Sequence, residues 1–119
     1  MPPTVPDLSD VTLVNESPEE GTPGDVSVFR TVREACAYLE PWWVEDREGF
    51  VLSATGDRLV LGTDGRTVEV VRREAHPDGL ALVTAWLSRS AIAVQAARRD
   101  AGPPSTSIED LIAYIGFQR

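Results

Sequence analysis

The chain has 119 residues, of which 25% are charged and 42% are hydrophobic, proportions that are ordinary for one globular domain. The formal net charge is −8, and all 11 basic residues are arginines. No basic face is available to neutralise phosphates, so direct binding of nucleic acid is not expected. No apolar run approaches the roughly 20 residues of a membrane span, and a membrane partner is not expected either.

Cysteine and histidine each occur once, as Cys36 and His76. A lone cysteine cannot form an internal disulfide, and the N-terminus lacks the basic start and apolar stretch of a secretory signal. We therefore expect a cytoplasmic protein. One histidine and one cysteine are too few for a metal site, no glycine pattern resembles a phosphate-binding loop, and no cofactor is expected.

Residues 1–27 hold six acidic side chains and no basic one, whereas residues 28–119 are nearly neutral. Their content of Pro, Gly, Ser and acidic residues is typical of a flexible leader. One apolar patch, "VTLV" at 11–14, interrupts this pattern and is expected to add as an edge strand to the body or to another chain. We therefore predict a leader over 1–27 and a single domain over 28–119.

The first predicted element of the domain is a helix over residues 31–40. Thr31 and Glu34 have the spacing of a capping box, and apolar residues follow at helical intervals as Val32, Ala35, Cys36 and Leu39. This stripe predicts that Cys36 is a small buried hydrophobe. Pro41 is expected to end the helix, because a proline disfavours the helical conformation of the residue before it.

Three short runs with alternating apolar residues follow, over 49–55, 58–63 and 66–74. Gly56-Asp57 and Asp64-Gly65 separate them and are typical of tight turns. The runs predict an antiparallel meander with one solvated face.

After the loop at 75–79, with Asp78 as candidate N-cap, apolar residues predict a helix from Leu80, either unbroken to Arg99 or broken near Ser90. Thr106 to Glu109 then opens a last helix with an apolar stripe, which must dock on the sheet or on the preceding helix. The predicted fold is α+β: a helix, a three-stranded meander, and two or three helices packed on one face of the sheet.

The adjacent Trp42 and Trp43 pose the main functional question, because neighbouring side chains of an extended segment point to opposite faces. We predict that Trp43 points inward and Trp42 outward; the alternatives exchange the two rings or bury both. An exposed indole among carboxylates is typical of a protein interface that attracts a basic partner. The predicted partner-binding residues are Tyr38, Trp42, Trp43, Glu45, Asp46, Glu48 and Asp57, with Glu40 nearby.

No catalytic residues are predicted. His76 lies in a Pro-Asp-Gly loop, where surface exposure is the usual outcome, and no nucleophile is spaced around it. The carboxylates Glu45, Asp46 and Glu48 fit a solvated connector better than an acid–base pair. A small enzyme using Glu45, Asp46 and His76 remains the third hypothesis, and it requires these residues to converge.

The stretch from Phe29 to Leu61 resembles the front half of small bacterial immunity proteins, which are encoded beside polymorphic or contact-dependent toxins. The resemblance lies in Leu39-Glu40-Pro41, the acidic connector, the strand at 50–54, the Gly56-Asp57 turn and the strand at 59–61. The later "HPDGLALVTAWL" resembles their turn and Leu-rich helix. The acidic leader and the long link over 88–107 depart from the pattern.

This resemblance implies a cytoplasmic protein that binds one cognate toxin domain and occludes its active site. A basic toxin that acts on nucleic acid would match the acidic character of the chain. The alternative is a non-inhibitory adaptor or effector chaperone that uses the same surface.

Overall fold

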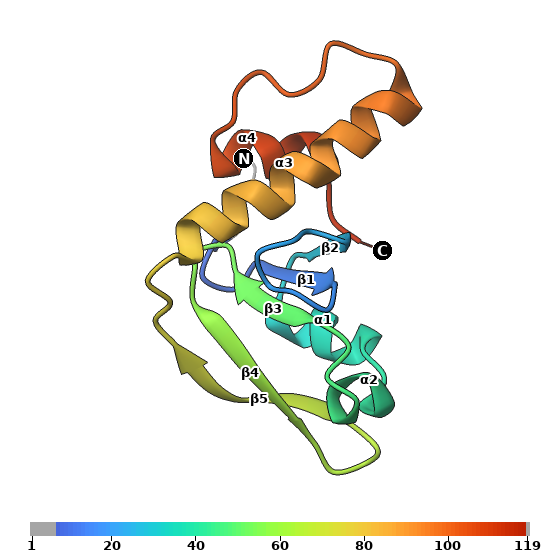
Figure 1. Cartoon of the computed structure of the whole chain (residues 1–119), viewed down its shortest axis with the longest axis vertical. Helices are drawn as coiled ribbons and strands as arrows, with labels where there is room; N and C mark the ends of the chain where they lie inside the picture. The colour runs from blue at the N-terminus through green and yellow to red at the C-terminus, as the bar shows by residue number, and fades with distance from the viewer. Residues whose placement is uncertain (1–6, 119) are drawn as a thin grey trace, which may run out of the picture.

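Figure 1 shows the computed structural model, which describes residues 7–118. The sheet is built from β1 (Thr12–Glu16), β2 (Asp25–Phe29), β3 (Phe50–Ser53), β4 (Arg58–Thr63) and β5 (Val68–Glu74). The helices are α1 (Val32–Tyr38), α2 (Pro41–Glu45), α3 (Gly79–Arg98) and α4 (Ile108–Ile115). The α+β class and the strands β3, β4 and β5 are as predicted, but the sheet is larger than a meander.

The five strands are antiparallel in the order β2-β1-β3-β4-β5, so β1 lies inside the sheet, with β2 and β3 as neighbours. The prediction that "VTLV" is a flexible or edge segment is therefore wrong. A continuous apolar run is typical of a strand buried on both faces, and Leu13 and Val14, which point to opposite faces, are both almost fully buried. The composition around the run hid this strand, because its neighbours are turn residues.

Helices cover both faces of the sheet, which corrects the prediction that they share one face. On one face, Leu13 and Leu52 form a core with Trp86 and Leu87 of α3 and with Leu111 of α4. On the other face, a second core fills the space beneath α1 and α2; it contains Val14, Phe29, Ala35, Leu39, Trp43, Val51, Leu59 and Val68. Figure 1 shows the sheet between these two pairs of helices.

Pro41 both ends one helix and begins the next. α1 starts at the Thr31 cap, whose side chain accepts the Glu34 N–H at 3.1 Å as predicted, and closes at Leu39. Pro41 then occupies the first position of α2, where its fixed φ suits a helix and its missing N–H costs nothing. The segment expected to be an extended connector is therefore a short helix.

α3 runs unbroken from Gly79 to Arg98, and α4 packs along it. The apolar stripe of α4 docks on the α3 side of the sheet, as predicted. The N-cap is Ser107, which accepts the Asp110 N–H, and not Thr106 of the predicted capping box. Within the described residues α3 is the one helix long and apolar enough to span a membrane, a criterion that core helices also meet. The sequence showed no such run because Arg89 and two serines interrupt its apolar residues.

Candidate functional site

The two tryptophans of α2 have opposite environments. Trp42 is 53% exposed, whereas Trp43 is 6% exposed and belongs to the core beneath α1 and α2. The predicted orientation is confirmed, although the reason is different. In a helix, consecutive side chains diverge by about 100°, which is enough here to send one ring to solvent and the other into the core.

Trp43 is seated by a close approach of the backbone at Gly49. A Cβ atom at this position would lie 2.7 Å from Cζ2 of Trp43 and 2.2 Å from the carbonyl oxygen of Asn15. Only glycine leaves room for the ring and for β1 at once. This contact fixes how α2 sits on the sheet, and it therefore fixes where Trp42 points.

Exposed carboxylates surround the Trp42 ring. Glu45 and Asp46 follow it by three and four residues and so lie on the same side of α2. Glu16 and Glu48 line a hollow of about 290 Å³ together with Trp42, and Glu40 precedes the helix. No ion pair within residues 7–118 involves any of these carboxylates. We call the set Glu16, Glu40, Trp42, Glu45, Asp46 and Glu48 the α2 surface.

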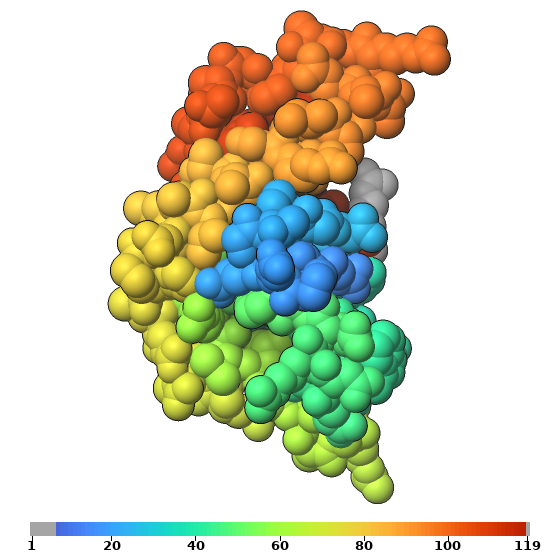
Figure 2. Space-filling model, in the orientation of Figure 1, coloured from blue at the N-terminus to red at the C-terminus, as the bar shows by residue number. Residues whose placement is uncertain are grey.

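A shallow cleft continues from this surface across the sheet. The hollow beside Trp42 shares Pro18, Trp43 and Arg47 with a second hollow of about 610 Å³, which extends to Phe50 and Val60. Figure 2 shows this face, where the β1–β2 loop in blue, the α2 segment in green and β4 in yellow-green surround the depression. The α2 surface thus borders a partly apolar cleft.

Arg47 lines the hollow beside Trp42 and brings a positive charge there, and its backbone ends α2. Its φ is +52°, and the Glu48 N–H bonds to the Trp43 carbonyl while the Arg47 N–H bonds to that of Val44. This pair of bonds is a Schellman motif, in which glycine is the usual residue at the left-handed position. Sequence reasoning missed the motif, because an arginine does not signal a helix end. It also missed Glu16, because this residue of β1 is far from Trp42 in the sequence.

Three of the predicted partner-binding residues, Tyr38, Trp43 and Asp57, do not belong to the α2 surface, and Trp43 is buried in the core. Tyr38 is half exposed, but its ring packs on Phe29 with centroids 5.1 Å apart. Asp57 follows the end of β3 remote from α2 and accepts a hydrogen bond from Arg73 at 3.4 Å. Asp57 is therefore engaged with the chain's own arginine.

The prediction that His76 is a surface residue is wrong, because its side chain is only 9% exposed. Its Nδ1 accepts the Asp78 N–H at 3.0 Å, so the ring proton sits on Nε2 and is donated to Glu20 at 2.7 Å. The Glu20 carboxylate also accepts three hydrogen bonds from Arg58, and the Glu20 carbonyl accepts the Trp86 indole N–H at 2.9 Å. We call Glu20, Arg58, His76 and Trp86 the Glu20 cluster.

The Glu20 cluster joins four distant parts of the chain, namely the β1–β2 loop, β4, the loop before α3, and α3 itself. Partial burial by itself raises the pKa of the Glu20 carboxyl, but the hydrogen bonds from His76 and Arg58 outweigh it and hold that pKa below its ordinary value. Arg58 and His76 lie 38 and 56 positions from Glu20 in the sequence. No local sequence signal could have revealed this pairing.

The three residues of the enzyme hypothesis are not brought together. Glu45 and Asp46 are exposed on α2, whereas the Nε2 of His76 is bonded to Glu20 next to the start of α3. Cys36 is half buried rather than in the core, and burial, with Glu69 nearby, raises the pKa of its thiol. Within residues 7–118, no group of three or more His, Cys, Asp or Glu side chains is placed to hold a metal ion.

The chain matches no protein-family model, no curated protein and no solved structure.

Proposed function

We propose that this chain is a protein-binding module that docks a basic partner protein through the α2 surface. The carrying observation is the indole of Trp42, which is 53% exposed at the centre of carboxylates that have no arginine partner within the described residues. Tryptophan is enriched at protein interfaces, where its ring is buried in a pocket of the partner.

The two components of the α2 surface have separate physical roles. Burying an indole in a partner's pocket supplies a large apolar area with few rotamers to freeze, which is why tryptophan is enriched among interface hot spots. Glu45, Asp46 and Glu48 contribute mainly long-range attraction, which raises the association rate with a basic partner and weakens as salt is added.

The form of this function that we favour is neutralisation of a cognate bacterial toxin in the cytoplasm by occlusion of its active site. The support is the resemblance of residues 29–61 to immunity proteins, together with the acidic character of the α2 surface. A toxin that acts on nucleic acid carries a basic cleft, and the α2 surface is complementary to such a cleft. A non-inhibitory adaptor is the second candidate, because it would use the same surface.

The test is titration with the protein encoded by the neighbouring gene, using isothermal calorimetry. We expect Trp42→Ala to weaken binding by about 2 kcal/mol or more, the threshold for a hot spot. Ile92→Ala is the matched control, because Ile92 is 61% exposed on α3 and should leave the affinity unchanged. Equal affinities for Trp42→Ala and the unaltered protein would place the interface elsewhere.

Growth separates the two forms of the proposal. An immunity protein restores growth of cells that express the active neighbouring toxin, and Trp42→Ala reduces this protection in proportion to the lost affinity. An adaptor binds with the same affinity but leaves the cells sensitive. Binding without protection would therefore exclude neutralisation while retaining the docking surface.

A further inference from the structure

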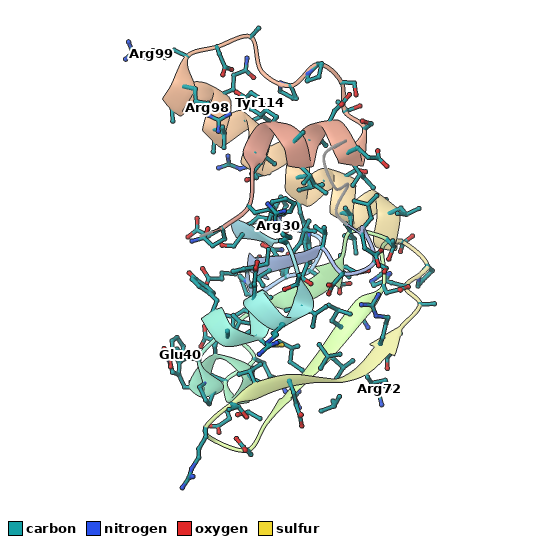
Figure 3. The ribbon with its side chains drawn as sticks, turned by 180° about the vertical axis from the view of Figure 1, so that it is seen from behind. Arg30, Glu40, Arg72, Arg98, Arg99 and Tyr114 are labelled. Atoms are coloured by element: carbon teal, nitrogen blue, oxygen red, sulfur yellow. The ribbon has the colours of Figure 1, made fainter. Side chains whose placement is uncertain are left out.

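A second depression, with a volume of about 750 Å³, lies between α1 and β5. Its apolar lining comes from both elements and includes Val32, Cys36, Leu39, Val68 and Val70. In Figure 3 α1 lies above β5; Glu40 lies toward one end of this groove, and Arg72 lies further along β5 in the other direction. We call this depression the α1–β5 groove.

The strand that borders the groove is an unpaired edge of the sheet. β5 pairs only with β4, and within residues 7–118 the outer side of Val68–Glu74 has no backbone hydrogen bond to another segment. At the opposite edge of the sheet, β2 is contacted by the C-terminal segment, where the Gln118 N–H donates to the Val28 carbonyl at 2.6 Å. Between Val68 and Glu74, the outer side of β5 therefore offers main-chain groups that no segment within residues 7–118 pairs with.

The free edge is protected along only half of its length. The second half carries a bulge opposite Val60 and Leu61, followed by the charged residues 72–74. Arg73 closes that end by donating to the Ser9 carbonyl at 2.8 Å. Bulges and charges are the devices by which proteins prevent unwanted strand pairing. The first half, Val68–Val70, has neither a bulge nor such a closure.

We propose that the α1–β5 groove receives an extended segment of a partner protein, which adds to the sheet as a sixth strand beside Val68–Val70. The free N–H and C=O groups of β5 supply the main-chain hydrogen bonds, and the apolar lining receives every second side chain of the segment. The same lining favours small branched side chains such as valine at those positions.

The charges around the groove define the segment further. Arg33 and Arg66 contribute positive charge, whereas Asp10, Glu40 and Glu69 contribute negative charge. Charges of both signs that nearly cancel give little preference for an acidic or a basic occupant, so the segment that fits is uncharged. In this respect it differs from the basic partner of the α2 surface, and the two proposals can fail independently.

The probe for the test is a fluorescein-labelled hexapeptide of alternating threonine and valine, and binding is measured by fluorescence polarisation. Two further peptides carry N-methyl groups, which remove amide N–H donors; one peptide is methylated on its valine amides and the other on its threonine amides. Because alternate N–H groups of a strand point to the same edge, only one of these two sets of amides faces β5, and only methylation of that set blocks pairing with β5. We expect that peptide to bind about tenfold more weakly, since it loses two or three hydrogen bonds.

Ala37→Arg is the variant that fills the groove, because Ala37 is exposed on α1 and lines it. We expect at least about a tenfold loss of peptide affinity, whereas Ala93→Arg, at an exposed position of α3, serves as the control and changes nothing. Hydrogen exchange should slow at Val68–Val70 when the peptide is bound. Alkylation of Cys36 by N-ethylmaleimide should slow as well, which reports on the groove without any substitution.

Three results would overturn the proposal. The first is no binding of the unmodified peptide up to about 1 mM, the weakest affinity that a specific short strand should show. The second is equal binding of both N-methylated peptides, which would exclude strand pairing. The third is a dimer of the chain that Ala37→Arg dissociates, which would assign the groove to a second copy. Trp42→Ala and Glu45→Gln, at two positions of the α2 surface that do not line the groove, should leave peptide binding unchanged.

Discussion

At the scale of single residues, the position of each side chain follows from its neighbours more than from its type. Trp42 and Trp43 are adjacent and chemically identical, yet one is exposed and the other is in the core. His76 and Glu20 are both polar, yet they are largely buried because each satisfies the other. Burial of polar groups at little cost requires such partners, and here they come from distant parts of the chain.

The Glu20 cluster gives a prediction about pH. Glu20→Gln should lower the free energy of unfolding at pH 7 by about 1–2 kcal/mol, because the ion pair with Arg58 is lost and the carboxylate that accepts from His76 becomes a neutral amide. The folded-state pKa of Glu20 lies below the value of about 4.5 for the unfolded chain, so the stabilisation is complete above pH 4.5. It disappears as the pH falls through the folded-state pKa.

Urea unfolding at several pH values measures this effect. The difference in stability between Glu20→Gln and the unaltered protein should be constant from pH 7 to about pH 5 and should shrink below pH 4.5. Glu45→Gln, at an exposed position, is the control and should show no pH-dependent difference. A difference for Glu20→Gln that persists unchanged at pH 3 would contradict the role given to the carboxylate.

At the scale of elements, the boundaries of helices are set by single residues with special backbone requirements. Pro41 separates α1 from α2, and Arg47 ends α2 in a left-handed conformation at φ +52°. For a residue with a Cβ atom this conformation costs about 1–2 kcal/mol. The short helix that presents Trp42 is therefore closed by a strained residue.

Arg47→Gly should relieve this strain and raise the free energy of unfolding by up to about 1 kcal/mol, after allowing for the greater flexibility of glycine in the unfolded chain. The same substitution at Arg33, within α1, should lower stability by about 1 kcal/mol, because glycine is unfavourable inside a helix. Opposite signs for these two variants in urea denaturation would verify the motif. Equal destabilisation would show that the Arg47 side chain makes contacts that outweigh its backbone strain.

At the scale of the whole molecule, β1 holds the two halves of the structure together. Its side chains enter both cores, with Leu13 on the α3 side and Val14 on the α1 side, and its backbone pairs with β2 and β3. Each fully buried Val or Leu contributes about 1.5–3 kcal/mol of burial energy, against a total stability of about 5–15 kcal/mol for a typical domain.

A chain shortened to residues 28–119 should therefore fail to fold, although it keeps every element from α1 onward. We expect poor dispersion of its amide resonances in proton–nitrogen NMR spectra and no cooperative thermal transition. Adding a peptide of residues 7–30 should restore the dispersed spectrum, because it returns β1 and β2. Cooperative unfolding of the shortened chain alone would show that the sheet does not depend on β1.

The sequence by itself determined the α+β class, the strands β3 to β5 and the cap of α1, and it favoured the orientation of Trp42 and Trp43 that the contact at Gly49 then fixes. These features depend on local periodicity, on turn residues and on one proline, all of which act over a few residues. Only the tertiary structure decided the central place of β1, the division of the helices between two faces, the separation of Asp57 from the α2 surface, and the bonding of His76 to Glu20. Each of these depends on contacts between segments far apart in the chain, whose free energy is gained only when the whole sheet has formed.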